Sequence, residues 1–145
     1  MILNENENNK NEMPGGTFPN MTEVKGCREV IVGVPTYNNE DTIGPTIEML
    51  LGQTRSPDRI VFCDKSDDQT RERIRDFQQE DQDVSIEILE QEGSGVADAY
   101  NEILKYVSGE YDLFATIQTD LTIDESWLAG HIEIHEKHPE IDMVT

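Results

Sequence analysis

The chain has 145 residues, a length typical of one domain, and a net charge of −20 from 31 acidic and 11 basic residues. This acidic excess argues against nucleic-acid binding, which needs Lys and Arg side chains to displace the counterions of phosphates. No stretch approaches the roughly 20 apolar residues of a membrane span, and the N-terminus lacks the basic and apolar segments of a secretory signal. We therefore expect neither a nucleic-acid partner nor a membrane span in this chain.

The acidic residues are spread along the chain, and Lys is scarce. One interpretation is a host with a very salty cytoplasm, where screening makes a heavily carboxylated surface tolerable. The other is an ordinary acidic protein. The two interpretations differ in how folding should respond to salt.

Residues 1–25 are rich in Asn, Glu, Gly and Pro, and they show no sustained apolar period. We expect a disordered tail there, followed by one domain over residues 26–145. The domain should begin with a strand over residues 29–35, a nearly continuous β-branched run of the kind that is buried on both faces of a sheet. Asp41 and Thr42 then offer N-cap oxygens to a first helix that ends near Gly52.

Strands and helices are expected to alternate over the rest of the domain. Further strands are predicted at residues 59–63, 84–89, 113–118 and 141–145. Further helices are predicted at residues 68–79, from about Val96 to Gly109, and from about Glu125. Ser66 and Gln69 form a capping-box pattern at the start of the second helix, whose exposed arginines should pair with nearby acids. On the third helix, an apolar stripe is expected at Val96, Tyr100, Ile103, Leu104 and Val107.

This alternation predicts an α/β fold, with a parallel sheet, right-handed crossovers and helices on both faces. In such sheets, ligands bind outside the C-terminal ends of the strands, where the strand order reverses. The loops that leave those ends are rich in acids, hydroxyls and amides. They comprise residues 35–41, 63–68, 91–101 and 118–120.

The strand-end loops contain no familiar phosphate-binding motif. Gly93-Ser94-Gly95 follows the third strand, whereas a dinucleotide fingerprint should follow the first, and a Walker-type lysine loop is absent from the sequence. A carboxylate at a strand end can instead hold a divalent cation that bridges phosphate oxygens. Asp120 stands at such an end; the alternative is that it caps the following turn.

Four stretches in order resemble motifs of the inverting family 2 glycosyltransferases, and the resemblance runs from about Arg28 to Thr145. The stretches are VIVGVPTYNNEDTI, LLGQTRSPDRIVFCDKSDDQT, GVADAYNEIL and GEYDLFATIQTDLTIDESWL. The resemblance implies a GT-A fold, which is a Rossmann-like, mostly parallel sheet with helices on both faces. It also implies transfer of a sugar, with inversion, from a nucleotide-diphosphate sugar to an acceptor hydroxyl on a glycan, lipid or protein glycan.

The resemblance carries functional residues over to this sequence. Asp120 would be the direct ligand of Mg²⁺ or Mn²⁺, and Asp64 would accept a hydrogen bond from the base. Asn101 and the turn at Gly95 would lie near the diphosphate or ribose. The nucleotide-binding residues that it implies are Pro35, Thr36, Tyr37, Glu40, Asp64, Ser66, Gly95, Asn101 and Gln118.

The chain departs from the family pattern at several motif positions. Gln118 replaces the first acid of Asp-x-Asp, and an amide can bond a ribose hydroxyl but brings no charge to a metal. Cys63 replaces the first acid of Asp-Asp-Gly-Ser, and Lys65 replaces its Gly. Tyr100 stands where a basic residue is common. Lys65 could help the metal to offset the repulsion between an acidic protein and a diphosphate.

Family members continue beyond the metal motif into an acceptor half that supplies the catalytic base. We expect this chain to be the nucleotide-sugar-binding part of a longer enzyme in the cytoplasm, either free or at the cytoplasmic face of the membrane. We name no base because Asp124 and Glu125 follow the motif too soon. The main alternative is a non-catalytic nucleotide-sugar-binding module. A receiver-like phosphate-handling domain fits less well, because the first strand ends in Pro-Thr-Tyr-Asn.

The remaining reactive side chains have simpler interpretations. Cys27 and Cys63 lack a metal-type spacing, and two free thiols in a reducing cytoplasm are expected. His131 and His135 share a helix face that could hold zinc, but no acid follows the first His as a metalloprotease motif requires. A solvated or partly packed face is therefore the better interpretation, and Trp127 is expected to anchor the core.

Overall fold

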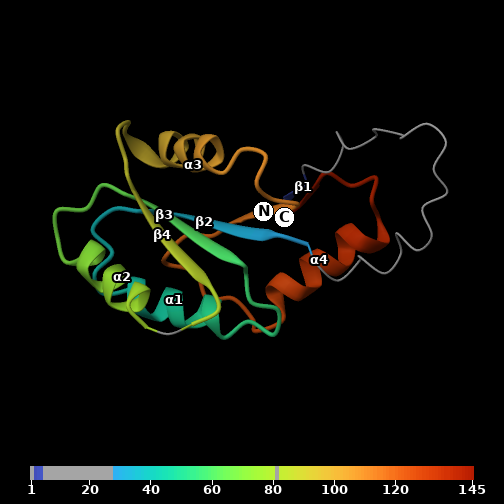
Figure 1. Ribbon diagram of the computed structural model, residues 1–145, viewed down its shortest axis with the longest axis horizontal. Coiled ribbons are helices and arrows are strands. Elements are labelled where there is room, and N and C mark those ends of the chain that lie inside the picture. The colour runs from blue at the N-terminus through green and yellow to red at the C-terminus, as the bar shows by residue number, and fades with distance from the viewer. Residues whose placement is uncertain (1, 5–27, 81) are drawn as a thin grey trace.

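The computed structural model describes residues 2–4, 28–80 and 82–145. The described elements form one sheet with the strand order β4-β3-β2-β5-β1-β6, flanked by helices (Figure 1). In chain order they are β1 (Ile2–Asn4), β2 (Val30–Thr36), α1 (Ile43–Leu51), β3 (Arg59–Asp64), α2 (Thr70–Gln78), β4 (Ser85–Glu90), α3 (Gly95–Tyr106), β5 (Leu113–Thr116), α4 (Trp127–Lys137) and β6 (Met143–Val144).

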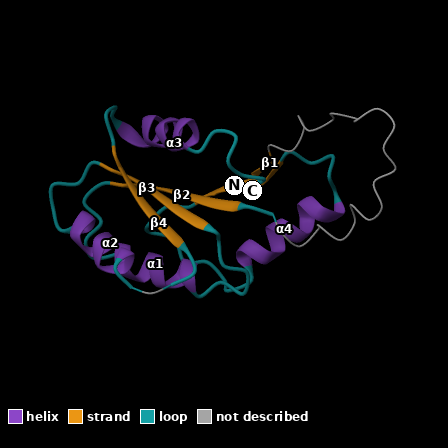
Figure 2. Cartoon of the chain, viewed as in Figure 1, coloured by secondary structure: helices purple, strands orange, loops and turns teal. Residues whose placement is uncertain are grey.

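Helices cover both faces of the sheet, as predicted. Figure 2 shows α3 on one side of the sheet and α1 and α2 on the other. Ile47 of α1, Ile74 of α2 and Leu128 of α4 belong to one buried cluster, whereas Ile103 of α3 belongs to a second. The sheet thus separates two apolar cores, which confirms the predicted α/β architecture.

The central strand β2 is buried on both faces because its side chains alternate between the two cores. Val30, Val32 and Val34 pack into the core on the α1 side, and Ile31 packs into the core under α3. β2 runs parallel to β3 and to β5. The chain leaves β2 toward β3 and β4 and later returns to its other side as β5, so the strand order reverses between β2 and β5.

The prediction of a disordered tail over residues 1–25 is wrong for residues 2–4. Ile2–Asn4 form β1, which pairs antiparallel with both β5 and β6, and Ile2 is completely buried. A strand this short carries no period that a sequence could reveal. Residues 1 and 5–27, including Cys27, lie outside the described residues.

Two local predictions also differ from the structure. The capping box does not form, because the Ser66 hydroxyl donates to Asp64, and the Asp68 carboxylate accepts from the backbone N of Thr70 at 2.9 Å. His135 is completely buried, with Nδ1 3.0 Å from the carbonyl oxygen of Ile141, because α4 packs this face against the following turn.

The predictions for Trp127 and Cys63 are confirmed. Trp127 packs against the core, and Cys63 is a buried free thiol. Burial raises the pKa of the Cys63 thiol to about 12, with a further contribution from the Glu102 carboxylate. Within the described residues, no helix is long and apolar enough to cross a bilayer.

Candidate functional site at the strand ends

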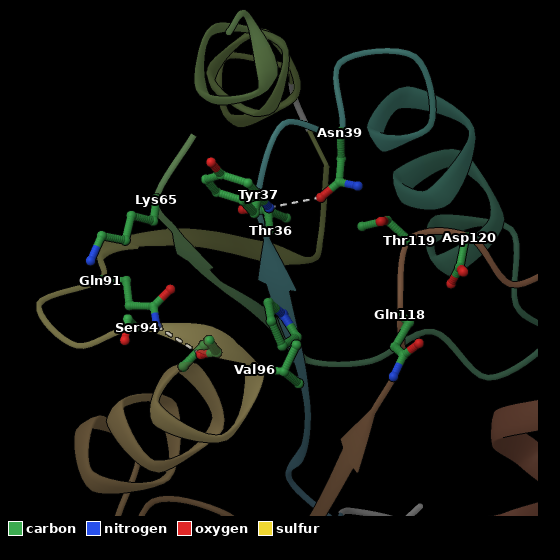
Figure 3. A pocket seen from close by; sticks show the side chains of 13 residues that line it. Thr36, Tyr37, Asn39, Lys65, Gln91, Ser94, Val96, Gln118, Thr119 and Asp120 are labelled. Atoms are coloured by element: carbon green, nitrogen blue, oxygen red, sulfur yellow. Dashed lines mark hydrogen bonds between the residues drawn. The ribbon is translucent and has the colours of Figure 1, made fainter. Parts of the chain in front are cut away.

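A pocket of about 620 Å³ opens at the C-terminal ends of the parallel strands, beside the reversal of strand order (Figure 3). Its volume lies within the usual range for small-molecule sites. The loops after β2, β3, β4 and β5 all contribute to its walls. The lining residues are Pro35, Thr36, Tyr37, Asn39, Lys65, Gln91, Ser94, Gly95, Val96, Ala99, Gln118, Thr119 and Asp120.

The loop after β2 presents an aromatic ring to the pocket. The side chain of Asn39 accepts a hydrogen bond from the backbone N of Tyr37 at 2.8 Å, and its own backbone N donates to Thr70 Oγ1 at 2.8 Å. Asn38 adopts a positive φ of 52°, which Asn tolerates better than most residues. The loop is thus fixed by side chains of the loop and α2, and Tyr37 remains 65% exposed.

Asp64, at the end of β3, stabilises the site through hydrogen bonds made outside the pocket lining. It is completely buried, and one carboxylate oxygen accepts from Thr36 Oγ1 at 2.6 Å and from Ser66 Oγ at 2.7 Å. Its other oxygen accepts from Arg71 Nε at 3.0 Å. This network joins the ends of β2 and β3 to α2, and it leaves Asp64 outside the residues that line the pocket.

Lys65 follows Asp64 and faces the pocket. Its backbone N donates to the carbonyl of Thr36 at 3.1 Å, which places it beside Tyr37, the next residue of the neighbouring loop. Its ammonium donates to the carbonyl of Gly93, across the pocket wall. Lys65 is the cation among the residues that line the pocket, and Asp120 is the anion.

The loop between β4 and α3 is held by acids of α3. Glu102 accepts from the backbone N of Gly93 at 2.8 Å and of Glu92 at 3.0 Å, and Asp98 accepts from that of Ser94 at 2.9 Å. The N–H donors of Gly93 and Glu92 hold the pKa of the Glu102 carboxyl below its usual value. These bonds hold Ser94 and the start of α3 in a defined position at the pocket wall.

Asp120 presents an exposed carboxylate at the end of the β5 loop. The loop is held by Thr46 of α1, whose hydroxyl donates to the carbonyl of Thr119 at 3.1 Å. The carboxylate of Asp120 makes no hydrogen bond or ion pair with the residues that the structure describes, whereas Asp124 accepts from the backbone N of Ser126 at 2.9 Å. Among the described residues, the Asp120 side chain therefore shows no capping bond to the turn that follows it, whereas Asp124 bonds Ser126 just before α4.

The pocket fits a metal that arrives with a phosphate ligand better than a metal held by protein alone. Across residues 2–4, 28–80 and 82–145, no group of three or more His, Cys, Asp or Glu side chains could hold an ion. Mg²⁺ at nucleotide sites is commonly bound by one or two carboxylates, with phosphate oxygens and water completing its octahedron. The carboxylate of Asp120, which has no partner in the part of the chain that the structure describes, matches that donor set.

The structure brings together some of the predicted residues. Those that line the pocket are Pro35, Thr36, Tyr37, Gly95, Gln118 and Asp120. Those outside its lining are Glu40, Asp64, Ser66 and Asn101. Glu40 instead accepts from the backbone N of Gln69 at 3.2 Å, and Asn101 is exposed on α3.

Sequence reasoning missed several lining residues. They are Asn39, Gln91, Ser94, Val96, Ala99 and Thr119. All lie within or next to the strand-end loops, so their position in the sequence was the signal that could have marked them as site residues. Val96 was expected on the buried stripe of α3 but is 53% exposed, because the first turn of α3 borders the pocket.

Curated relatives match most of this chain. WfgD of Escherichia coli, a UDP-Glc:alpha-D-GlcNAc-diphosphoundecaprenol beta-1,3-glucosyltransferase, is 35% identical over 107 residues, which are 72% of this chain and 38% of WfgD. TuaG of Bacillus subtilis (strain 168), described as a teichuronic acid biosynthesis glycosyltransferase, is 32% identical over 114 residues, which are 78% of this chain and 42% of TuaG. The chain thus spans about two-fifths of the length of these relatives.

Solved structures share the fold. S. aureus TarS (residues 1–349) has a TM-score of 0.58 and 24% identity, over 77% of this chain and 33% of that one. Glucosyl-3-phosphoglycerate synthase of Mycobacterium tuberculosis, in complex with Mn²⁺, UDP and phosphoglyceric acid, has a TM-score of 0.62 and 20% identity, over 77% and 40% of the two chains. These likenesses confirm the GT-A type of α/β fold. Residues 31–145 also match the family model described as "Glycosyl transferase family 2", and the chain therefore belongs to that family.

Proposed function

We propose that the pocket binds a nucleotide-sugar donor together with Mg²⁺ or Mn²⁺, and that the chain is the donor-binding part of an inverting glycosyltransferase. The observation that carries this proposal is the exposed carboxylate of Asp120, which has no partner among the described residues, in a pocket that also presents the exposed Tyr37. A carboxylate suits a cation that accompanies a diphosphate, and an aromatic face suits a base. The family membership and the relatives' names support the reaction class.

Each wall of the pocket would contribute a separate task. Tyr37 would stack on the base, and the Gln118 amide would bond a ribose hydroxyl. The turn at Gly95, where the 12-residue helix α3 begins, would lie near the diphosphate or ribose, because a helix N-terminus favours negative charge. Asp120 would hold the metal, which when bound stabilises the departing nucleoside diphosphate.

The relatives also suggest the class of donor and the setting of the reaction. WfgD is named for a UDP-Glc donor, TarS has been solved in complex with UDP-GlcNAc, and the mycobacterial synthase has been solved with Mn²⁺ and UDP. We extend to this chain a nucleotide-diphosphate sugar donor and an acceptor hydroxyl of unidentified chemistry. A cytoplasmic location, at or near the membrane face, is consistent with the name of WfgD, which includes a diphosphoundecaprenol acceptor.

Calorimetric titration of the chain with UDP and with GDP tests this proposal. We expect at least one nucleotide to bind in the presence of Mg²⁺ or Mn²⁺, and binding to be nearly abolished by EDTA, because the acidic protein would otherwise repel the diphosphate. Equal affinity under EDTA would contradict the metal's role. Failure of both nucleotides to bind with either metal would contradict the donor site itself.

A further inference from the structure

We propose that Lys65 is a specificity-determining residue that reads the donor's base and favours a keto base over an amino base. On this proposal the pocket prefers uracil to cytosine, or guanine to adenine, according to the ring size that it accepts. The inference rests on the proposed donor-binding function. It concerns a side chain that the family motif does not supply, because the family has Gly at this position.

The sheet order gives the pocket two distinct ends. β2 lies between β3 and β5, so Lys65 after β3 and Asp120 after β5 stand on opposite sides of Tyr37, as Figure 3 shows. A metal and the phosphates that it holds belong at the carboxylate end, and the start of α3, marked by Val96 in Figure 3, lies between the two ends. The base therefore belongs at the other end, where the aromatic ring of Tyr37, a residue 65% exposed, offers a stacking surface.

The ammonium of Lys65 is oriented at that base end before any ligand binds. Its backbone is tied to Thr36, next to Tyr37, and its ammonium donates to the carbonyl of Gly93. An ammonium group has three N–H donors and no acceptor, so two donors remain for a ligand. These can bond the O4 of uracil or the O6 of guanine, whereas the N4 amino group of cytosine and the N6 amino group of adenine would meet a donor with a donor.

Asp64, the acid expected to bond the base, is not placed to do so in this structure. Asp64 is 0% exposed, and its carboxylate accepts bonds from Thr36, Ser66 and Arg71. Glu40 lies outside the pocket lining as well. Lys65 is therefore the charged side chain that the described structure places at the base end.

The experiment compares UDP with CDP, and GDP with ADP, by calorimetry at constant Mg²⁺ and ionic strength. Wild-type protein should bind the keto member of the accepted pair more tightly, by roughly tenfold, the effect of one hydrogen bond to a charged group. Lys65→Met should remove this preference by weakening the keto nucleotide alone, and Lys65→Arg should retain it. Lys105→Met, an exposed charge-matched change on α3 outside the pocket lining, should alter neither affinity.

The outcomes separate this inference from the function on which it rests. Equal weakening of the keto and amino nucleotides by Lys65→Met would overturn the proposal, because it would mean that Lys65 acts on the diphosphate charge or only holds the loop. An unchanged preference would overturn it as well. If wild-type protein bound none of the four nucleotides, the donor site itself would be contradicted, and the inference would fall with it. Thermal unfolding of each variant verifies that it is folded.

Discussion

Two aspartates at strand ends on either side of β2 have opposite environments, although the sequence places both at the end of an apolar run. Asp64 is completely buried and accepts three side-chain hydrogen bonds, including one from Arg71. Asp120 is exposed in the pocket and has no such partner among the described residues. Burial with partners suits a structural role, and exposure without them suits ligand binding.

Because Asp64 has a structural role, removing the charge of its partner Arg71 should have a large effect on stability. Arg71→Met should lower the free energy of unfolding by about 2–3 kcal/mol, because it leaves a buried carboxylate without its cation. Arg73→Met, on an exposed position of the same helix, should change it by less than about 0.5 kcal/mol. Urea denaturation compares the two. Equal effects of both variants would mean that the ion pair contributes no stability of its own.

At the scale of elements, the start of α3 depends on a backbone conformation that Gly adopts readily. Gly95 has a φ of +80° and Gly109 a φ of +77°, and an added Cβ would meet nothing within 4 Å at either position. Gly95→Ala and Gly109→Ala should therefore each cost about 1 kcal/mol of stability through strain alone. Only Gly95→Ala should weaken nucleotide binding, because Gly95 lines the pocket. Equal losses of nucleotide affinity in the two variants, measured by calorimetry, would contradict a ligand position beside Gly95.

The loop before α3 should also respond to pH through Glu102. Its folded-state pKa lies below the unfolded value of 4.5, because it accepts from the backbone N of Gly93 and Glu92. The stabilisation is therefore fully present above pH 4.5 and is lost as the pH falls through the lower folded value. Amide hydrogen exchange at Glu92 and Gly93 should be faster in Glu102→Gln than in wild type at neutral pH, and this difference should shrink in acid. A difference that is constant with pH would exclude the carboxylate as the anchor.

The sequence predicted most elements because their apolar patterns are local. The runs that became β2, β3 and β4 needed no knowledge of their neighbours. β1 was missed because Ile2–Asn4 becomes a strand only by pairing with β5 and β6, more than a hundred residues away. In the site, the position of the strand-end loops indicated Asp120 as a candidate, whereas Tyr37 was named through the family resemblance. The burial of Asp64 was not predictable in this way, because it depends on how α2 packs against the ends of β2 and β3.

At the scale of the whole molecule, 31 acidic residues outnumber 11 basic residues, so the chain carries a large excess of negative charge. Their mutual repulsion destabilises the compact state and weakens as salt screens it. If the chain is adapted to a salty cytoplasm, its unfolding midpoint should rise steadily from low to molar KCl. Circular dichroism follows this directly. A midpoint that does not change with salt would favour an ordinary acidic protein.

In the proposed donor site, the carboxylate of Asp120 couples a divalent cation to a nucleoside diphosphate. Calorimetric titration tests this coupling with UDP, or with GDP if that is the nucleotide bound, once in Mg²⁺ and once in EDTA. The test variant is Asp120→Asn. The control is Asp142→Asn, which removes the same charge at an exposed position outside the pocket lining. We expect Asp120→Asn to lose roughly tenfold or more in affinity with Mg²⁺ and to become insensitive to EDTA, while Asp142→Asn behaves as wild type. Full Mg²⁺-dependent binding by Asp120→Asn would contradict the claim.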